Sequence, residues 1–261
     1  MAGINVASGD FGHHNLASCD DPSKESEYYW TILMEQQQHA THKVVLSSEG
    51  FLRPSDNLVA FSKEFDSVKI LLYVRDQLSL IESIYLTHQV MGGTFSHLRH
   101  LTNCGYFSDI EDFFRKSSEI FDFFNYIGAW QSIFGKESMR ARLYLPRSDS
   151  FDVLDDFLDC LDIDKTRIVK PLERLNISLM PDFSSLLLSL DEADLFKSAA
   201  PHIRRQVIEN LLRLSDQFRH TSTNSLISPE LAGEIKNLYR ESNKAFAQEY
   251  LTPSEADILL S

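Results

Sequence analysis

The sequence predicts an α/β fold of three layers, in which a small parallel sheet is flanked by many helices. Three short runs rich in β-branched and aliphatic residues, 43–47, 68–74 and 139–145, are typical of strands. The stretches between them are long enough for helical crossover connections, as parallel pairing requires. With 261 residues, 43% of them hydrophobic, the chain can also bury a sizeable core.

A helix is predicted to precede the first strand. Asp21 is a typical N-cap residue and Pro22 suits the first helical position, so we expect a helix from there to about residue 40. The run 43–47 is the first predicted strand. Residues 58–65 then form a short crossover helix, and the strands on either side of it are expected to pair in parallel.

The second strand, 68–74, is the strongest of the three and leads into a helix that Asp76 is placed to cap. That helix runs to about Val90. Helical periodicity dominates from 110 to 134, and the third strand ends before Pro146. Beyond it the pattern is helical, at residues 151–161, 181–190, 201–218 and 229–250. We therefore expect a single domain over 1–261, with an α/β part at 1–145 and a mainly helical part at 146–261.

The charge balance restricts the partners of the chain. There are 38 acidic and 25 basic residues, and the net charge of -13 argues against nucleic acid and anionic membranes. An anionic ligand must therefore be held by a local basic site. Cys19, Cys104 and Cys160 lack the spacing of a metal site, so no metal is expected.

The N-terminal residues show neither the basic nor the apolar region of a secretory signal. No apolar run approaches the ~20 residues that span a bilayer. We expect a cytoplasmic protein without a transmembrane segment. The apolar stripe of the final predicted helix, 229–250, is expected to pack on its own domain or to form a homodimer interface.

Arg75 lies between the predicted strand 68–74 and the helix that follows it. Open α/β sheets bind ligands at this edge, a helix N-terminus favours anions, and the forked guanidinium suits phosphate. Ser83 is seven residues after Asp76, about two helical turns, so its hydroxyl is on the same helix face. Arg75 and Ser83 can hold one phosphate. In the alternative interpretation Arg75 pairs with Asp76 or Glu82, and Ser83 is a neutral surface residue.

The string VKILLYVRDQLSLIESIY, from Val68 to Tyr85, is followed by Gln89 and Gly92. It is similar to the 3′-phosphate-binding strand and helix of nucleotide-dependent sulfotransferases, most of all to bacterial sulfotransferase-like proteins often associated with surface glycans. Further segments look like those of the family in the same order, so the resemblance covers nearly the whole chain. They are residues 12–17, 44–51, 126–135 with Trp130, 140–144, 156–158, 176–179 and 242–251.

The resemblance implies a P-loop NTPase-like fold and a nucleotide-binding role for the 1–145 part. The donor would be 3′-phosphoadenosine 5′-phosphosulfate, used as a co-substrate without a metal. The reaction would be transfer of a sulfuryl group to a hydroxyl or amine, and a glycan or glycolipid is the implied acceptor. By the same resemblance Arg75, Ser83 and Ser48 bind the nucleotide.

A base must take the proton of the acceptor. The resemblance points to Glu49, after the second sheet strand of the family, and the alternative is a capping or structural carboxylate beside a turn. His13 and His14 are a second candidate pair, because imidazole titrates near neutral pH. Their alternative interpretation is a surface histidine pair.

One family feature is missing. The family begins with a strand and a loop resembling Pro-Lys-x-Gly-Thr-Thr, which holds the 5′-phosphate and the sulfate, whereas residues 1–12 contain no lysine or arginine. We expect severely reduced activity, and strands left with unpaired backbone groups. Three explanations remain open: the sequence starts inside a longer gene product, it has been trimmed, or the protein is a degenerate family member.

Two other functions remain open at this point. One is a non-catalytic relative that binds a nucleotide or a partner, which the missing loop and the acidic, helix-rich second half favour. The other is an unrelated helical interaction protein in which Arg75 is structural. A structure without a parallel sheet that has Arg75 at its carboxyl edge would favour the latter.

Overall fold

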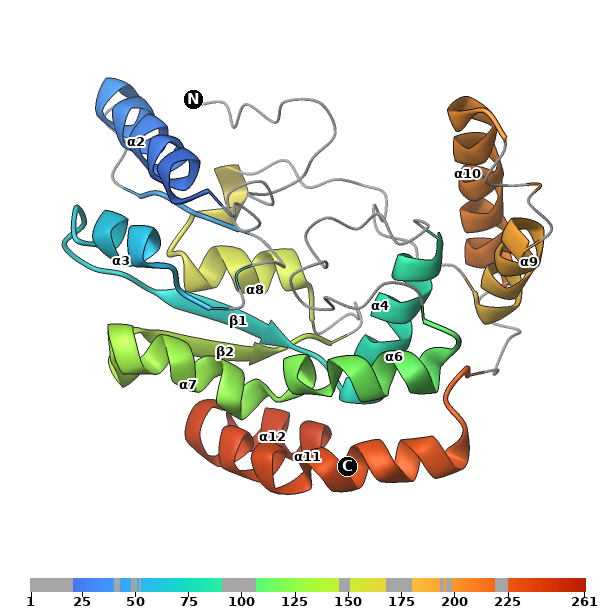
Figure 1. Ribbon diagram of the computed structural model, residues 1–261. Helices are drawn as coiled ribbons and strands as arrows, with labels where there is room; N and C mark the ends of the chain where they lie inside the picture. The colour runs from blue at the N-terminus through green and yellow to red at the C-terminus, as the bar shows by residue number, and fades with distance from the viewer. Residues whose placement is uncertain are drawn as a thin grey trace.

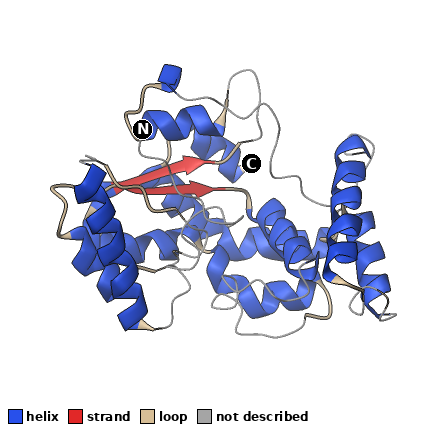
Figure 2. Ribbon diagram, turned by 90° about the horizontal axis from the view of Figure 1, so that it is seen from above, coloured by secondary structure: helices blue, strands red, loops and turns tan. Residues whose placement is uncertain are grey.

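The computed structural model describes residues 21–39, 43–47, 51, 53–90, 107–145, 151–167, 180–192, 195, 199–218 and 225–261. Within them, strands β1 (Ile70–Val74) and β2 (Met139–Leu143) form a parallel two-stranded sheet. The register pairs Ile70 with Met139 and Val74 with Leu143. Figure 2 shows the two strands side by side and pointing the same way.

Helices make up most of the described chain and lie on both sides of this sheet (Figure 1). Short 3₁₀ segments at Ser118–Phe121, Lys136–Ser138 and Lys165–Arg167 connect some of them. The helices are α2 (Pro22–His39), α3 (Asp56–Ser62), α4 (Gln77–Val90), α6 (Ile110–Ser117), α7 (Phe123–Phe134), α8 (Val153–Cys160), α9 (Pro181–Glu192), α10 (Pro201–Phe218), α11 (Pro229–Tyr250) and α12 (Pro253–Leu260).

One face of the sheet forms the larger part of the core. Side chains alternate along a strand, so Val74, Ala141 and Leu143 point to the same face. They pack with helices α7, α11 and α12 through residues such as Trp130 and Phe246. The strands and the last two helices therefore share one core, although more than 100 residues separate β2 from the end of the chain.

A second core joins α4, α6 and α11. Ile81 and Phe113 are fully buried there, and Ile235 and Tyr239 close it from α11. Helices α9 and α10 form a smaller cluster around Leu187 and Leu211, and Figure 1 shows both apart from the sheet. Helix α11 thus contacts both the helix that follows β1 and the sheet itself.

The prediction of an α/β chain with a small parallel sheet is confirmed, but the first predicted strand is wrong. Residues 43–47 form no sheet ladder in the structure. Val44 and Leu46 are partly buried against Tyr29 and Phe61, so the strand-like alternation arises from packing on α2 and α3. A strand needs a backbone partner, and the parallel unit expected on either side of residues 58–65 does not form.

Several boundaries also differ from the sequence prediction. The helix expected at 58–65 is α3, which starts earlier because the Ser55 hydroxyl accepts the N–H of Leu58 at 3.1 Å. The helical stretch 110–134 is interrupted before α7, where Asp122 accepts the N–H of Asn125 at 3.1 Å as a new N-cap. Helix α12 was not predicted, although Thr252 and Glu255 form a capping box at its start.

The expectation of unpaired backbone groups applies to the outer edges of the sheet, because β1 and β2 pair with each other in the described chain. The ladder covers all five residues of β1 and β2, and Val74 O accepts the N–H of Tyr144 at 2.6 Å beyond it. In a parallel ladder the intervening backbone groups point to the outer edges. On the outer edge of β2, the N–H of Leu143 donates to Glu255 at 3.0 Å. No described helix is long and apolar enough to cross a membrane.

Candidate functional site

Arg75 lies at the carboxyl end of β1, between the last strand residue, Val74, and the first residue of α4, Gln77. Its side chain is partly buried. Asp76 caps α4, because its carboxylate accepts the N–H of Ser79 at 2.8 Å. The strand, the arginine and the capped helix are therefore arranged as the sequence predicts.

The two carboxylates that were alternative partners of Arg75 are engaged elsewhere. Asp76 caps the helix, and Glu82 accepts the Ser225 hydroxyl at 3.1 Å and the N–H of Leu226 at 2.5 Å. Within the part of the chain that the structure describes, Arg75 makes no hydrogen bond and no ion pair. A partly buried cation is thus left without a carboxylate.

Of the other predicted nucleotide-binding residues, Ser83 is described. It lies on α4, two turns after Asp76 on the same side of the helix, and it is partly buried. Ser48, Glu49, His13 and His14 lie outside the described residues. The structure therefore brings together Arg75 and the helix that bears Ser83.

A pair of amides, one buried and one partly buried, joins the start of α4 to α11. Gln77 Nε2 donates to Asn243 Oδ1 at 2.7 Å, and Asn243 Nδ2 donates back to Gln77 Oε1 at 3.0 Å. Gln77 is only 6% exposed. Next to Asn243, the hydroxyl of Ser242 donates to Asp122, the N-cap of α7. Adjacent residues of α11 therefore hold the beginnings of two other helices.

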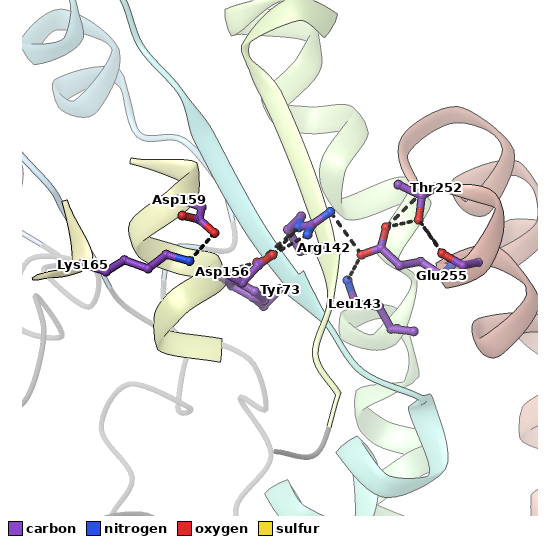
Figure 3. Close-up of polar contacts among 9 residues, drawn as sticks. Tyr73, Arg142, Leu143, Asp156, Asp159, Lys165, Thr252 and Glu255 are labelled. Carbon is purple, nitrogen blue, oxygen red and sulfur yellow. Dashed lines mark hydrogen bonds and ion pairs between the residues drawn. The ribbon is translucent and has the colours of Figure 1, made fainter. Parts of the chain in front are cut away.

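A second polar cluster crosses the other face of the sheet (Figure 3). The guanidinium of Arg142 on β2 contacts Asp156 of α8, with Nε to Oδ1 at 3.0 Å, and lies 3.6 Å from Glu255 of α12. The Tyr73 hydroxyl on β1 donates to the same Asp156 at 2.6 Å. Both carboxylate side chains are 12% exposed and that of Arg142 is 33% exposed.

This cluster shifts the pKa values of its members. Hydrogen bonds from Arg142 lower the pKa of Asp156 more than burial raises it. Burial also acts to raise the pKa of Glu255, but hydrogen bonds from Thr252 and the N–H of Leu143 outweigh it and the pKa is lowered. Burial, followed by the bond to Asp156, raises the pKa of Tyr73. The carboxylates are therefore ionised and the phenol is neutral at pH 7.

Arg142 and Arg75 differ in what surrounds them. Arg142 is neutralised by two carboxylates, and it fastens α8 and α12 to the sheet. A pocket of about 290 Å³ borders β2 on its outer edge, with Arg142 and Tyr250 in its lining. There Lys136 pairs with Glu249 at 3.2 Å. Its lining also holds Arg140, an exposed arginine whose Nη1 donates to the carbonyls of Glu137 and Met139, so Arg75 differs from it in being partly buried.

Sequence reasoning missed the Gln77–Asn243 pair and the Arg142 cluster. Their members are far apart in the chain, and Gln77 and Asn243 are separated by 166 positions. The capping box of Thr252 and Glu255 was the one local signal that could have revealed a member of the cluster. Among the described residues, no three His, Cys, Asp or Glu side chains gather to hold a metal ion. No protein-family model, curated protein or solved structure matches the chain.

Proposed function

We propose that the chain is a sulfotransferase-like protein that binds the 3′-phosphate of 3′-phosphoadenosine 5′-phosphosulfate through Arg75 and Ser83. In this proposal the chain has the three-layer, P-loop NTPase-like arrangement of that family. The observation that carries the proposal is the partly buried Arg75 at the carboxyl end of β1, which no described carboxylate neutralises.

The physical argument rests on the cost of burying charge. A buried cation is unfavourable unless it is paired and hydrogen-bonded. The chain has 38 acidic residues, and two of them, Asp76 and Glu82, lie close to Arg75 in sequence but bond to other groups. A bound phosphate would supply the missing negative charge in the bidentate geometry that a guanidinium prefers.

The proposed reaction is transfer of the sulfuryl group to a glycan or glycolipid hydroxyl. The acceptor oxygen forms a bond to sulfur, the bond from sulfur to the 5′-phosphate oxygen breaks, and 3′-phosphoadenosine 5′-phosphate leaves. Glu49, or His13 or His14, takes the acceptor proton. Arg75, Ser83 and Ser48 hold the nucleotide in place during this step.

A second candidate is a relative that binds the nucleotide without transferring the sulfuryl group. It is favoured by the acidic, helix-rich second half of the chain, because the leaving phosphate needs an electrostatic clamp of basic groups. Incubation with radiolabelled donor and a panel of glycan acceptors separates the two candidates. Labelled product indicates the enzyme, and binding without product indicates the non-catalytic relative.

Thermal unfolding with excess 3′-phosphoadenosine 5′-phosphate tests the nucleotide site that both candidates share. Ligand at 100 times its dissociation constant stabilises by about 2.7 kcal/mol, which raises Tm by roughly 5–10 °C for a chain of this size. Arg75→Ala should lose the shift. Arg140→Ala is the control, because Arg140 is an exposed arginine on β2 whose Nη1 donates to the Met139 carbonyl. A shift that persists in Arg75→Ala, or no shift in any protein, contradicts the proposal.

A further inference from the structure

The turn that carries Arg75 is only two residues long and is fastened at both ends. On one side, Val74 belongs to the ladder with β2, and its carbonyl accepts the N–H of Tyr144 at 2.6 Å. On the other side, Gln77 is bound to Asn243 by two hydrogen bonds. Arg75 and Asp76 bridge these two anchors, so moving either anchor changes the direction of the arginine.

The second anchor is a directional contact between α4 and α11. Farther along α4 the contacts with α11 are apolar, as at Ile81 and Ile235, and apolar contacts are not directional. The amide pair fixes both the distance and the rotation of the first turn, because each amide is donor and acceptor to the other. Gln77 Nε2 also lies 3.4 Å from the carbonyl of Phe121, the residue before the N-cap of α7.

We propose that the Gln77–Asn243 amide pair is a positioning device that holds Arg75 in the orientation in which it binds the nucleotide 3′-phosphate. The inference rests on the proposed function, since it assigns residues that set the affinity of that same site. Neither amide touches the ligand. Both act through the backbone of the turn, so their loss weakens binding while the sheet and the core remain folded.

The test measures the dissociation constant of 3′-phosphoadenosine 5′-phosphate by calorimetry, well below the unfolding temperature. Gln77→Leu keeps a similar volume but removes the amide, and it is expected to raise the dissociation constant about tenfold or more, because small misplacements of a binding group are costly. Asn243→Asp keeps the side-chain shape but loses the donor to Gln77 Oε1. It repeats the test in a milder form should Gln77→Leu fail to fold.

Two further variants separate positioning from general stability. The exchange Gln77→Asn with Asn243→Gln preserves the summed length of the two side chains and should restore the affinity of the wild type. Tyr239→Phe is the matched control, because it keeps the buried ring and removes one hydrogen bond of α11 that involves no residue of α4, from the Tyr239 hydroxyl to the Ser118 carbonyl at 2.6 Å. It should lower Tm and leave the dissociation constant unchanged.

The outcomes distinguish this inference from the proposed function. Weaker binding in Gln77→Leu or Asn243→Asp, with recovery in the exchanged pair, supports it. If the wild type binds and Arg75→Ala does not, but the amide variants bind like the wild type, the positioning role is overturned and the nucleotide site stands. Loss of affinity without recovery in the exchanged pair, or an equal loss in Tyr239→Phe, also overturns the positioning role. A wild type that does not bind overturns both.

Discussion

Replacing Arg142 with leucine should destabilise the protein strongly, because it leaves two largely buried carboxylates without their shared cation. Asp156 and Glu255 are each 12% exposed. Removing one partner of a buried ion pair costs about 3–5 kcal/mol, and the 33% exposure of Arg142 reduces this to roughly 2–4 kcal/mol. For a chain of this length the loss corresponds to a fall in Tm of about 5–12 °C.

The pH dependence of this loss follows from the pKa shifts. The pKa values of Asp156 and Glu255 are lowered in the folded protein, so their contribution to stability is present above the unfolded values of about 3.9 and 4.3. It disappears as the pH falls through the folded values. In Arg142→Leu both carboxylates are easier to protonate. The difference in unfolding free energy between wild type and variant should therefore be largest at pH 7 and become smaller towards pH 4.

Urea unfolding of both proteins between pH 4 and pH 8 measures this difference. Arg115→Leu is the matched control, because Arg115 also contacts two carboxylates, Glu111 at 2.6 Å and Glu234 at 3.1 Å, but at the surface. Surface pairs contribute little, so this variant should unfold almost like the wild type. Equal losses in the two variants, or a loss that does not change with pH, would refute the reasoning.

Three further variants test local features. Thr252→Ala removes the capping box of the last helix and should cost about 0.5–2 kcal/mol in urea unfolding, with faster amide exchange in that helix; unchanged exchange contradicts it. Gly135→Ala forces a side chain onto a residue with φ 80° and ψ 157° and should lower stability by about 1–3 kcal/mol, whereas an unchanged midpoint would show that the turn relaxes. The raised pKa of Tyr73 means that folding favours the neutral phenol. The contribution of Tyr73 to the free energy of unfolding is therefore complete below about pH 10, the unfolded pKa, and is lost as the pH rises further. Tyr73→Phe should flatten this alkaline loss in pH-dependent unfolding curves, and identical slopes would contradict the assignment.

Helix starts were the features that the sequence revealed most reliably. Asp21 with Pro22 and Asp76 begin helices where predicted, because a capping side chain bonds to N–H groups only two or three residues away. The position of Arg75 followed from the same local logic, since a strand that ends at Val74 and a cap at Asp76 leave it at the carboxyl edge of the sheet.

Strand identity and long-range polar contacts were harder to predict. Residues 43–47 alternate like a strand, yet the alternation reflects packing against two helices, and no local signal reports whether a backbone partner exists. Gln77 and Asn243 are ordinary helix residues by sequence. Only the tertiary fold, which places α11 against the start of α4, makes them partners.

The most direct test of the nucleotide site compares two ligands that differ only in the 3′-phosphate. The wild type and Arg75→Ala are titrated with 3′-phosphoadenosine 5′-phosphate and with adenosine 5′-phosphate. A hydrogen bond to a charged group contributes about 1.5–3 kcal/mol, so the wild type should bind the 3′-phosphorylated ligand roughly 10–100 times more tightly, and Arg75→Ala should bind both alike. Equal affinities in the wild type, or a preference that survives in Arg75→Ala, would contradict the account.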